Sequence, residues 1–185
     1  MMHPDTRLAW LGSEMGFGAV ATRFIPLGTV VWVLDPMDHV LPRVQFEALD
    51  GLYRPAMATY AYAESDGDMV LCWDHGRYLN HSCASNTLSG GHPWLVAVRD
   101  IAPDEQITDD YDTFGLGHKL ICGCGAPTCR RVVGHSAPSE LVRRDQDERF
   151  TAALPHVQQI PQPLWPLFGA SMREQLGEAL RGARA

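Results

Sequence analysis

The amino-acid sequence predicts a mainly β protein of the α+β class, with small sheets and a helical C-terminal tail. Two observations lead to this fold class. The 185 residues include 17 Gly and 13 Pro, and so many turn-forming residues favour short strands over long helices. From about residue 136 onward the pattern changes, because apolar residues then recur at helical spacing. A chain of this length suits one domain with a substantial core.

Short stretches that are β-branched, apolar or alternating predict strands in the first two thirds of the chain. They cover residues 8–10, 19–22, 29–34, 59–63, 69–73 and 94–98. Turns rich in Gly, Pro and Asp separate them, notably at 26–28, 65–68 and 90–93. Between 42 and 58, apolar residues from Val44 to Leu52 have roughly helical spacing, which predicts a short helix.

The tail is predicted to hold helices on both sides of a Pro-rich linker, Pro161 to Pro166. The residues that mark one face of its first part are Leu141, Val142, Phe150, Leu154 and Val157. Ser171 to Glu174 has a capping-box pattern, and Met172, Leu176 and Leu180 repeat at helical spacing. Two roles stay open for this tail: it caps a substrate groove or it forms a homodimer interface.

The charge balance bears on the partner. With 15 Lys and Arg against 22 Asp and Glu, the net charge is −7, which argues against nucleic acid as the main partner. Met1 to Asp5 lacks the charged and apolar regions of a signal peptide, and the apolar run Val30 to Leu34 is too short to span a bilayer. We therefore expect a cytoplasmic location without a membrane partner, where thiols stay reduced.

The most unusual stretch is Tyr78-Leu79-Asn80-His81-Ser82-Cys83, which places an amide, an imidazole, a hydroxyl and a thiol in consecutive positions. Burying such a cluster is unfavourable unless each group has a partner. We expect this stretch to lie at the crossing point of the fold, where Asn80 and His81 bind a cofactor and Cys83 binds a metal. The alternative is a surface loop, which would leave its apolar residues without a use.

The cysteines predict a zinc site. Cys122, Cys124 and Cys129 fall within eight residues, and Gly and Pro between them shape a turn. Zinc takes four ligands in structural sites, so a fourth must come from elsewhere. Cys83 is the first candidate, and His118 and His135 are the alternatives. Unconnected reduced thiols or a disulfide remain the competing interpretations, whereas Cys72 lies in an apolar run and is expected to be a buried structural thiol.

Four motifs in this order resemble those of the SET-domain protein lysine methyltransferases. They are the loop Gly16-Phe17-Gly18 with Ile25 to Thr29, the stretch Tyr78 to Asn86, the acidic segment Asp104 to Tyr111, and the cysteines from Cys122 to Cys129. The last resembles the post-SET zinc cluster of that family. Together the motifs cover about residues 8 to 134, and Ser139 to Gln159 resembles the helical tail of small bacterial members.

The resemblance implies a SET-type, β-clip-like fold with a pseudoknot, in which the segment ending in Tyr111 runs beside the loop carrying Asn80 and His81. It divides the chain into a SET domain at 8–116, a post-SET zinc-binding segment at 117–134 and a C-terminal helical extension at 135–185. It also implies S-adenosylmethionine as the methyl donor.

The resemblance also implies which residues contact the methyl donor. The backbone around Met15, Gly16, Phe17 and Gly18 would cradle the amino-acid part of the donor. Asn80 would contact its amino group, and His81 would contact adenine through its backbone.

Tyr111 would be the catalytic tyrosine and would also lie against the donor. Tyr60 matches a channel tyrosine on the preceding strand. An aromatic, desolvated channel favours the neutral amine that methyl transfer needs. Further candidates for its walls are Tyr62, Trp73 and Phe114, for which simple core packing is the alternative.

Asp109 departs from the family pattern. Two residues before the catalytic tyrosine the family usually has an aromatic residue that tunes the number of methyl groups added. A carboxylate at this position would pair with the substrate ammonium or accept a proton from a different nucleophile. The alternative for Asp109 and Asp110 is a solvated pair of turn residues.

Three functions remain open on these residues. The first is an S-adenosylmethionine-dependent methyltransferase acting on a lysine of a protein or peptide. The second is a SET-fold enzyme acting on a small-molecule or carrier-bound substrate. The third is a non-catalytic binding module, against which the intact Asn80, His81 and Tyr111 count.

Overall fold

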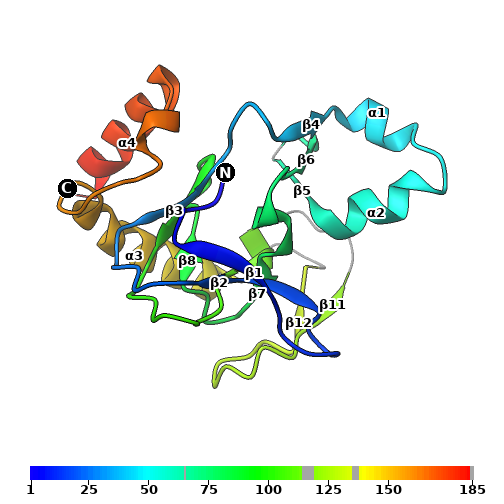
Figure 1. The fold of residues 1–185 in the computed structure, drawn as a ribbon, viewed down its shortest axis with the longest axis horizontal. Coiled ribbons are helices and arrows are strands. Elements are labelled where there is room, and N and C mark those ends of the chain that lie inside the picture. Colours follow the sequence, from blue (N-terminus) through cyan, green and yellow to red (C-terminus); the bar gives the residue numbers. More distant parts are fainter. Residues whose placement is uncertain (65, 114–118, 135–137, 184–185) are drawn as a thin grey trace.

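The computed structural model describes residues 1–185 except 65, 114–118, 135–137 and 184–185. Its described strands are short and pair into sheets of two or three strands, with helices concentrated in an insert near residue 50 and at the C-terminal end (Figure 1). This arrangement confirms the predicted mainly β, α+β fold class. Among the described helices, none combines the length and hydropathy needed to cross a membrane.

The chain opens with an antiparallel hairpin of β1 (Thr6–Trp10) and β2 (Phe17–Ala21). The predicted strands at 8–10 and 19–22 are thus present, and both begin two residues earlier than predicted, while the second ends at Ala21 instead of residue 22. Between them, Gly16 has φ of +75°, a conformation that residues with a Cβ rarely adopt. The β1–β2 loop therefore depends on glycine at this position.

The central sheet has the order β3-β9-β8, with β3 (Val30–Val33), β9 (Trp94–Ala97) and β8 (Thr87–Leu88). Every residue of these strands is buried. One face contributes Val30 and Val96 to a core shared with the C-terminal helices, and the other contributes Val31 and Leu95 to a core beneath the hairpin. The sheet is buried on both faces, which explains why 29–34 and 94–98 read as continuous apolar runs.

Between β3 and η1 (His75–Tyr78) the chain forms an insert, whose structure differs from the predicted elements in two places. It consists of β4 (His39–Leu41), α1 (Arg43–Glu47), α2 (Tyr53–Tyr60), β5 (Ala61–Ala63) and β6 (Met69–Leu71). The single helix expected within 42–58 is two helices. The strand expected at 59–63 begins only at Ala61, because Thr59 and Tyr60 complete α2 and the Thr59 hydroxyl donates to the Pro55 carbonyl at 2.8 Å. In residues 59–63, Tyr alternates with Ala over too short a stretch to distinguish the end of a helix from a strand.

Two segments far apart in sequence meet as parallel strands. β7 (Asn80–His81) pairs with β10 (Thr108–Asp109), and the Ser82 N–H donates to the Asp109 carbonyl at 3.0 Å. The short helix η1 (His75–Tyr78) leads into β7, and η2 (Tyr111–Thr113) follows β10. This confirms that the segment ending in Tyr111 runs beside the loop carrying Asn80 and His81.

The chain then forms β11 (Leu120–Ile121) and β12 (Val132–Val133), an antiparallel pair that flanks the cysteine-rich turn. The tail comprises α3 (Glu140–Val157), η3 (Trp165–Leu167) and α4 (Ala170–Gly182). The predicted helices are confirmed, but the capping box is not. Gly169 precedes the first turn of α4, so Ser171 lies inside the helix.

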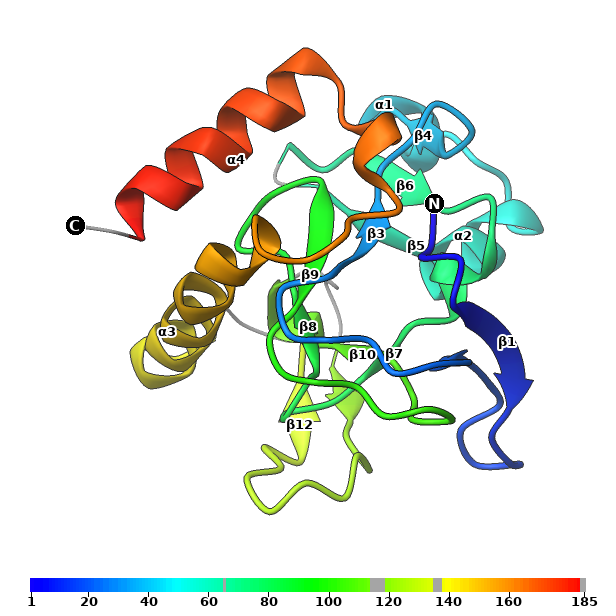
Figure 2. The same ribbon diagram turned by 60° about the vertical axis from the view of Figure 1, so that its left-hand side comes forward.

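In Figure 1 the C-terminal helices lie at the opposite end of the molecule from α1 and α2, and Figure 2 shows α3 beside β8 and β9 of the central sheet. The apolar residues Phe150, Leu154 and Phe168 of the tail share one core with the central sheet. The approach is close, because a Cβ added to Gly90 would lie 2.3 Å from the Phe150 ring. The tail is therefore built into the same core as the sheet.

Candidate functional site

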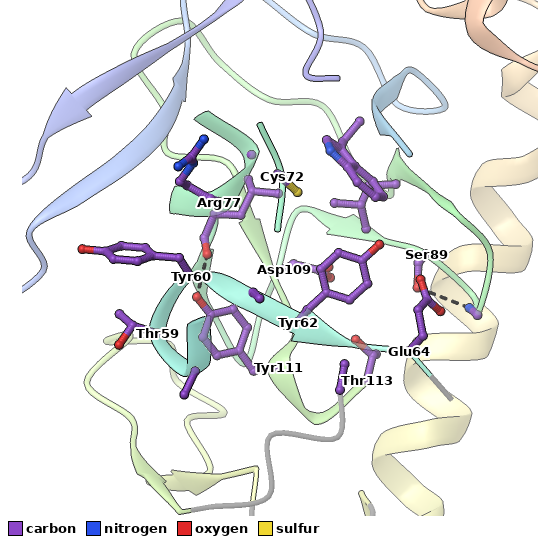
Figure 3. A pocket seen from close by; sticks show the side chains of 18 of the residues that line it. Thr59, Tyr60, Tyr62, Glu64, Cys72, Arg77, Ser89, Asp109, Tyr111 and Thr113 are labelled. Atoms are coloured by element: carbon purple, nitrogen blue, oxygen red, sulfur yellow. Dashed lines mark hydrogen bonds between the residues drawn. The ribbon is translucent and has the colours of Figure 1, made fainter. Parts of the chain in front are cut away.

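A cavity of about 550 Å³ opens between β5, η1 and the segment that ends in Tyr111 (Figure 3). Aromatic rings of Trp32, Tyr60, Tyr62 and Tyr111 line it. Trp32 and Tyr62 pack edge to face at 6.0 Å between ring centroids. The expected wall residues Tyr60, Tyr62 and Tyr111 therefore line one cavity. Sequence reasoning missed Trp32, because it lies in a buried strand far from the motifs.

The residues expected in the cavity wall include Trp73, Phe114 and Tyr60. Trp73 is absent from the cavity lining, and its indole N–H donates to the Asp35 carboxylate at 3.1 Å. Phe114 lies outside the described residues. Tyr60 lines the cavity from the end of α2, where its ring packs edge to face on Tyr78 with 5.5 Å between centroids.

Tyr111 is fixed at two points. Its backbone N–H donates to His81 Nδ1 at 3.1 Å, and its hydroxyl donates to the Leu79 carbonyl at 2.6 Å. Burial and, to a smaller extent, the nearby negative charge of Asp109 together raise the pKa of Tyr111 to about 12. The hydroxyl thus remains protonated at neutral pH, as a donor at the junction of η1 and β7.

Asp109 and Asp110 are buried, each 1% exposed, so the interpretation as a solvated turn pair is wrong. They are buried because β10 pairs with β7 inside the fold. Asp109 lines the cavity, and its Oδ1 accepts the Asp110 N–H at 2.7 Å. Among the described residues its Oδ2 has no hydrogen-bond partner. Burial raises the pKa of Asp109 to about 8.

Asp110 points to a different set of partners. Arg130 from the cysteine segment donates to its Oδ1, and Gln146 of α3 donates to its Oδ2 at 2.8 Å. This carboxylate therefore joins β10, the cysteine segment and the tail. Sequence reasoning missed Arg130 and Gln146. The available signal was a glutamine four residues before Phe150, on the apolar face of α3.

The residues expected to cradle the donor gather at the β1–β2 loop. Met15 and Phe17 are exposed, at 42% and 47%. The Asn80 amide Nδ2 donates to the Phe17 carbonyl at 3.0 Å, which leaves its Oδ1 as an acceptor. A Cβ on Gly18 would lie 2.4 Å from Leu11 Cδ1 and 2.9 Å from Asn80 Nδ2, so a larger residue here would have to displace these side chains. Next to Gly18, the Gln106 amide nitrogen Nε2 is buried and has no hydrogen-bond partner among the described residues.

These features fit a ligand with both ammonium and carboxylate groups, such as the amino-acid part of S-adenosylmethionine. The exposed loop offers backbone donors, and the Asn80 oxygen offers an acceptor. The predicted cradle residues do not line the aromatic cavity. Asn80 faces the loop while the adjacent Leu79 carbonyl meets Tyr111, so the β7 segment lies between the two regions.

His81 links the catalytic segment to the cysteines. Because its Nδ1 accepts the Tyr111 N–H, the ring proton is assigned to Nε2, which lies 3.3 Å from Cys83 Sγ. Burial lowers the pKa of His81, in keeping with a neutral ring. The side chain of His81 therefore has a structural role, which is separate from the adenine contact expected of its backbone.

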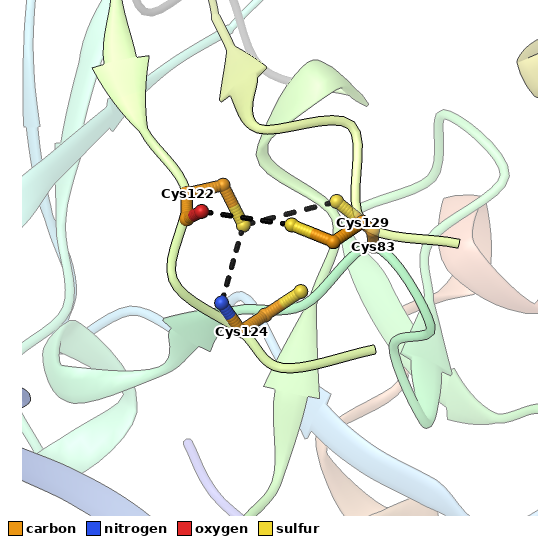
Figure 4. Close-up of side chains that lie close together, drawn as sticks. All are labelled: Cys83, Cys122, Cys124 and Cys129. Carbon is orange, nitrogen blue, oxygen red and sulfur yellow. Dashed lines mark hydrogen bonds between the residues drawn. The ribbon is translucent and has the colours of Figure 1, made fainter. Parts of the chain in front are cut away.

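Cys83, Cys122, Cys124 and Cys129 come together, as Figure 4 shows, with all four Sγ atoms within 4.8 Å of one another. The Cys83 and Cys122 sulfurs are 3.8 Å apart. A tetrahedral zinc with bonds of about 2.3 Å places its sulfur ligands about 3.8 Å apart. The Arg130 N–H lies 3.3 Å from Cys83 Sγ and can stabilise a thiolate there. Donor set and spacing both fit zinc.

The five cysteines differ in their surroundings, but all are free and none is in a disulfide in the described chain. Cys72 is 5% exposed and lies apart from the cluster, as expected of a buried structural thiol. The alternative ligands His118 and His135 lie outside the described residues.

Comparison with known proteins agrees with this arrangement. The SET domain family model matches residues 16–112, more than half of the chain. Histone-lysine N-methyltransferase ASHH3 of Arabidopsis thaliana is 32% identical over 147 residues, which cover 72% of this chain and 39% of that protein. Histone H3-lysine(4) N-trimethyltransferase ATX1 of the same plant is 39% identical over 69 residues, 34% of this chain and 6% of that protein. The chain thus spans well under half of these relatives.

A solved structure supports the fold. SUVH6 of Arabidopsis thaliana, crystallised in complex with SAM, superimposes with a TM-score of 0.53 and 21% identity over 68% of this chain and 32% of that chain. The family match begins at Gly16, the last residue of the β1–β2 loop, and includes Asn80, His81 and Tyr111, which the fold brings around one junction. The chain belongs to the SET-domain family.

Proposed function

We propose that this protein is an S-adenosylmethionine-dependent methyltransferase that methylates the side-chain amine of a lysine in a protein. The observation that carries the proposal is the placement of Tyr111. Its hydroxyl lies on the Leu79 carbonyl, between an aromatic cavity and a loop suited to the methyl donor. Family membership and the histone-lysine methyltransferase relatives support the same reaction class.

Each part of the site has a task in this reaction. S-adenosylmethionine, when bound, supplies a methyl group on a sulfonium that is open to in-line displacement. The β1–β2 loop and Asn80 hold the donor, while Tyr60, Tyr62 and Tyr111 hold the substrate side chain. The cavity excludes much of the water around the amine, which lowers the pKa of the amine below its reference value of about 10.4. Alignment of the two reactants supplies much of the rate enhancement.

Tyr111 and the cysteines have supporting roles. The Tyr111 hydroxyl, kept protonated, presents a fixed dipole where methyl transfer occurs. The four cysteines would hold a zinc ion that orders the segment around Arg130. Because Arg130 and His81 connect this segment to Asp110 and Tyr111, the ion would act on the site through structure and not through chemistry.

A small-molecule substrate is the second candidate. The cavity volume of about 550 Å³ falls within the range of small-molecule sites, about 300–1,000 Å³. The acidic net charge of −7 favours a basic protein substrate instead. We therefore place the protein substrate first.

Two measurements test the proposal. Calorimetry of the zinc-loaded protein with S-adenosylmethionine should show stoichiometric binding, and absence of binding would refute both enzyme functions. Transfer of tritiated methyl groups to a lysate, separated into protein and small-molecule fractions, should label protein. Label confined to small molecules would favour the second candidate.

A further inference from the structure

The carboxylate of Asp109 is an unused polar group in the wall of the substrate cavity (Figure 3). The side chain is buried, with Oδ1 satisfied by the Asp110 N–H and Oδ2 unpartnered in the described part of the chain. An unpartnered, buried carboxylate oxygen is unfavourable unless a cation or a proton comes to it. Because Asp109 lies in the cavity wall, a bound substrate could supply this cation or proton.

No described cation neutralises this carboxylate. The titratable side chains that line the same cavity are Tyr60, Tyr62, Glu64, Cys72, Arg77, His92 and Tyr111. The guanidinium of Arg77 donates instead to the carbonyls of Trp73 and Asp74. Asp110, which directly follows β10, adds a second negative charge, although Arg130 pairs with it.

We propose that Asp109 is the catalytic base that takes a proton from the ammonium of the substrate before methyl transfer. This inference rests on the proposed function, and it adds a group that deprotonates the attacking amine. A permanent ion pair would keep the nitrogen lone pair bonded to hydrogen and would block attack. A carboxylate with a raised affinity for protons can remove that proton, which leaves a neutral carboxyl group beside a neutral amine.

The proton and electron balance is complete. One ammonium N–H bond breaks and an O–H bond forms on Asp109 Oδ2, which frees the lone pair. The lone pair forms the N–C bond while the C–S bond breaks, and its electron pair stays on sulfur as a neutral thioether. The product is a methylated ammonium, and the Asp109 proton passes to solvent before the next turnover.

Burial makes the transfer feasible. The pKa of Asp109 is raised to about 8, whereas the same desolvation lowers that of an amine from about 10.4. The two affinities for a proton therefore approach each other inside the cavity. Free protein must have Asp109 ionised to accept the proton, so activity should increase as pH rises through about 8.

The first test is the pH profile of kcat/KM on a lysine substrate, with Asp109→Asn beside the intact protein. The intact protein should show an inflection near pH 8, where half of Asp109 is ionised, and reach its plateau above about pH 9. In the variant the amine must lose its proton to water, so the inflection should move toward about 10.4, with activity at pH 8 lower by about 10²-fold. Asp147→Asn, an exposed position on α3, removes the same charge and should leave the profile unchanged.

The second test does not depend on activity. Carbon-13 NMR of the side-chain carboxyls, without methyl donor, should show a resonance that titrates near pH 8 and is absent in Asp109→Asn. Titration of that resonance below about pH 5 would overturn the proposal. An unchanged pH profile in a variant that still binds S-adenosylmethionine would overturn it too, while leaving the proposed function intact. Failure of the intact protein to bind the donor would overturn both.

Discussion

At the scale of single residues, Tyr111 is held in position by one hydrogen bond of its backbone and one of its side chain. Its N–H is held by His81 Nδ1 and its hydroxyl by the Leu79 carbonyl. The first contact does not need the tyrosine side chain and can form with any residue except proline, whereas the second belongs to the hydroxyl alone. Substitution by phenylalanine therefore separates positioning of the segment from chemistry.

Tyr111→Phe should lower kcat by about 10²-fold, because a fixed donor at the point of reaction is lost. Binding of S-adenosylmethionine should change little, since the donor loop is held by Asn80. Single-turnover methyl transfer and calorimetry measure the two effects. Tyr53→Phe, at an exposed position on α2, is the matched control. An unchanged kcat in Tyr111→Phe would show that the hydroxyl has no catalytic role.

The residues that could be predicted from the sequence are those whose chemistry is concentrated in a local motif. Asn80, His81, Tyr111 and the cysteines belong to this group. Arg130 and Gln146 could not be found, because they act through Asp110, which is distant in sequence from both. The burial of Asp109 was missed for the same reason: the pairing of β10 with β7 decides it, and two adjacent aspartates resemble a turn.

At the scale of elements, the cysteine-rich turn between β11 and β12 depends on its ligands more than on apolar packing. Its small core consists mainly of Val133 and the cysteines themselves, with Leu120 packed against them. Such a segment has little to hold it in place without a metal, since a site of this kind contributes folding free energy directly.

Cys124→Ser should therefore release zinc and loosen residues 119–134 together. Metal content after dialysis against a chelator should fall from about one equivalent toward zero, because three remaining thiolates bind more weakly. Hydrogen exchange should increase in this segment and at Tyr111, which is linked to it through His81. Cys72→Ala, at a buried cysteine outside the cluster, should keep the metal. Full zinc retention in Cys124→Ser would contradict the proposed ligand set.

The contact between the 90–91 turn and α3 gives a second element-scale prediction. Gly90 and Gly91 both have positive φ, at +58° and +80°. A Cβ on Gly90 would meet the buried Phe150 ring at 2.3 Å, whereas a Cβ on Gly91 would meet nothing within 4 Å. Both alanine variants carry the backbone penalty of about 1 kcal/mol, but only Gly90→Ala adds a steric clash of about 1–3 kcal/mol.

Urea unfolding measures this difference directly. Gly90→Ala should show the lower midpoint, and Gly91→Ala serves as the matched control for backbone strain. Equal midpoints would mean that α3 shifts freely away from the turn.

Elements were predictable where one local pattern admitted one structure. The continuous apolar runs at 29–34 and 94–98 and the long amphipathic stretch of α3 are of this kind. Thr59, Tyr60 and Ser171 were misplaced because their patterns suit more than one element. In the structure α2 continues to Tyr60 and α4 begins at Ala170, and the local patterns do not fix either bound.

At the scale of the whole molecule, the tail and the central sheet form one core. Val30, Trp94 and Val96 of the sheet pack with Leu154 and Phe168 of the tail. The tail also reaches the site, because Gln146 holds Asp110 and Arg149 donates to the Ser85 carbonyl. A perturbation in α3 should therefore be transmitted to both the fold and the site.

Two leucines of α3 test this coupling. Leu154 is 2% exposed in the shared core, and Leu141 is 79% exposed on the same helix. Leu154→Ala should lower the free energy of unfolding by about 2–5 kcal/mol, since it removes buried apolar contacts and leaves a cavity. Leu141→Ala should change it by less than about 0.5 kcal/mol. Tryptophan fluorescence, which reports on buried Trp94, and zinc release, which reports on the cysteine cluster, should shift together in urea. If Leu154→Ala moved the fluorescence transition and left zinc release unchanged, the tail and the site would be separate folding units.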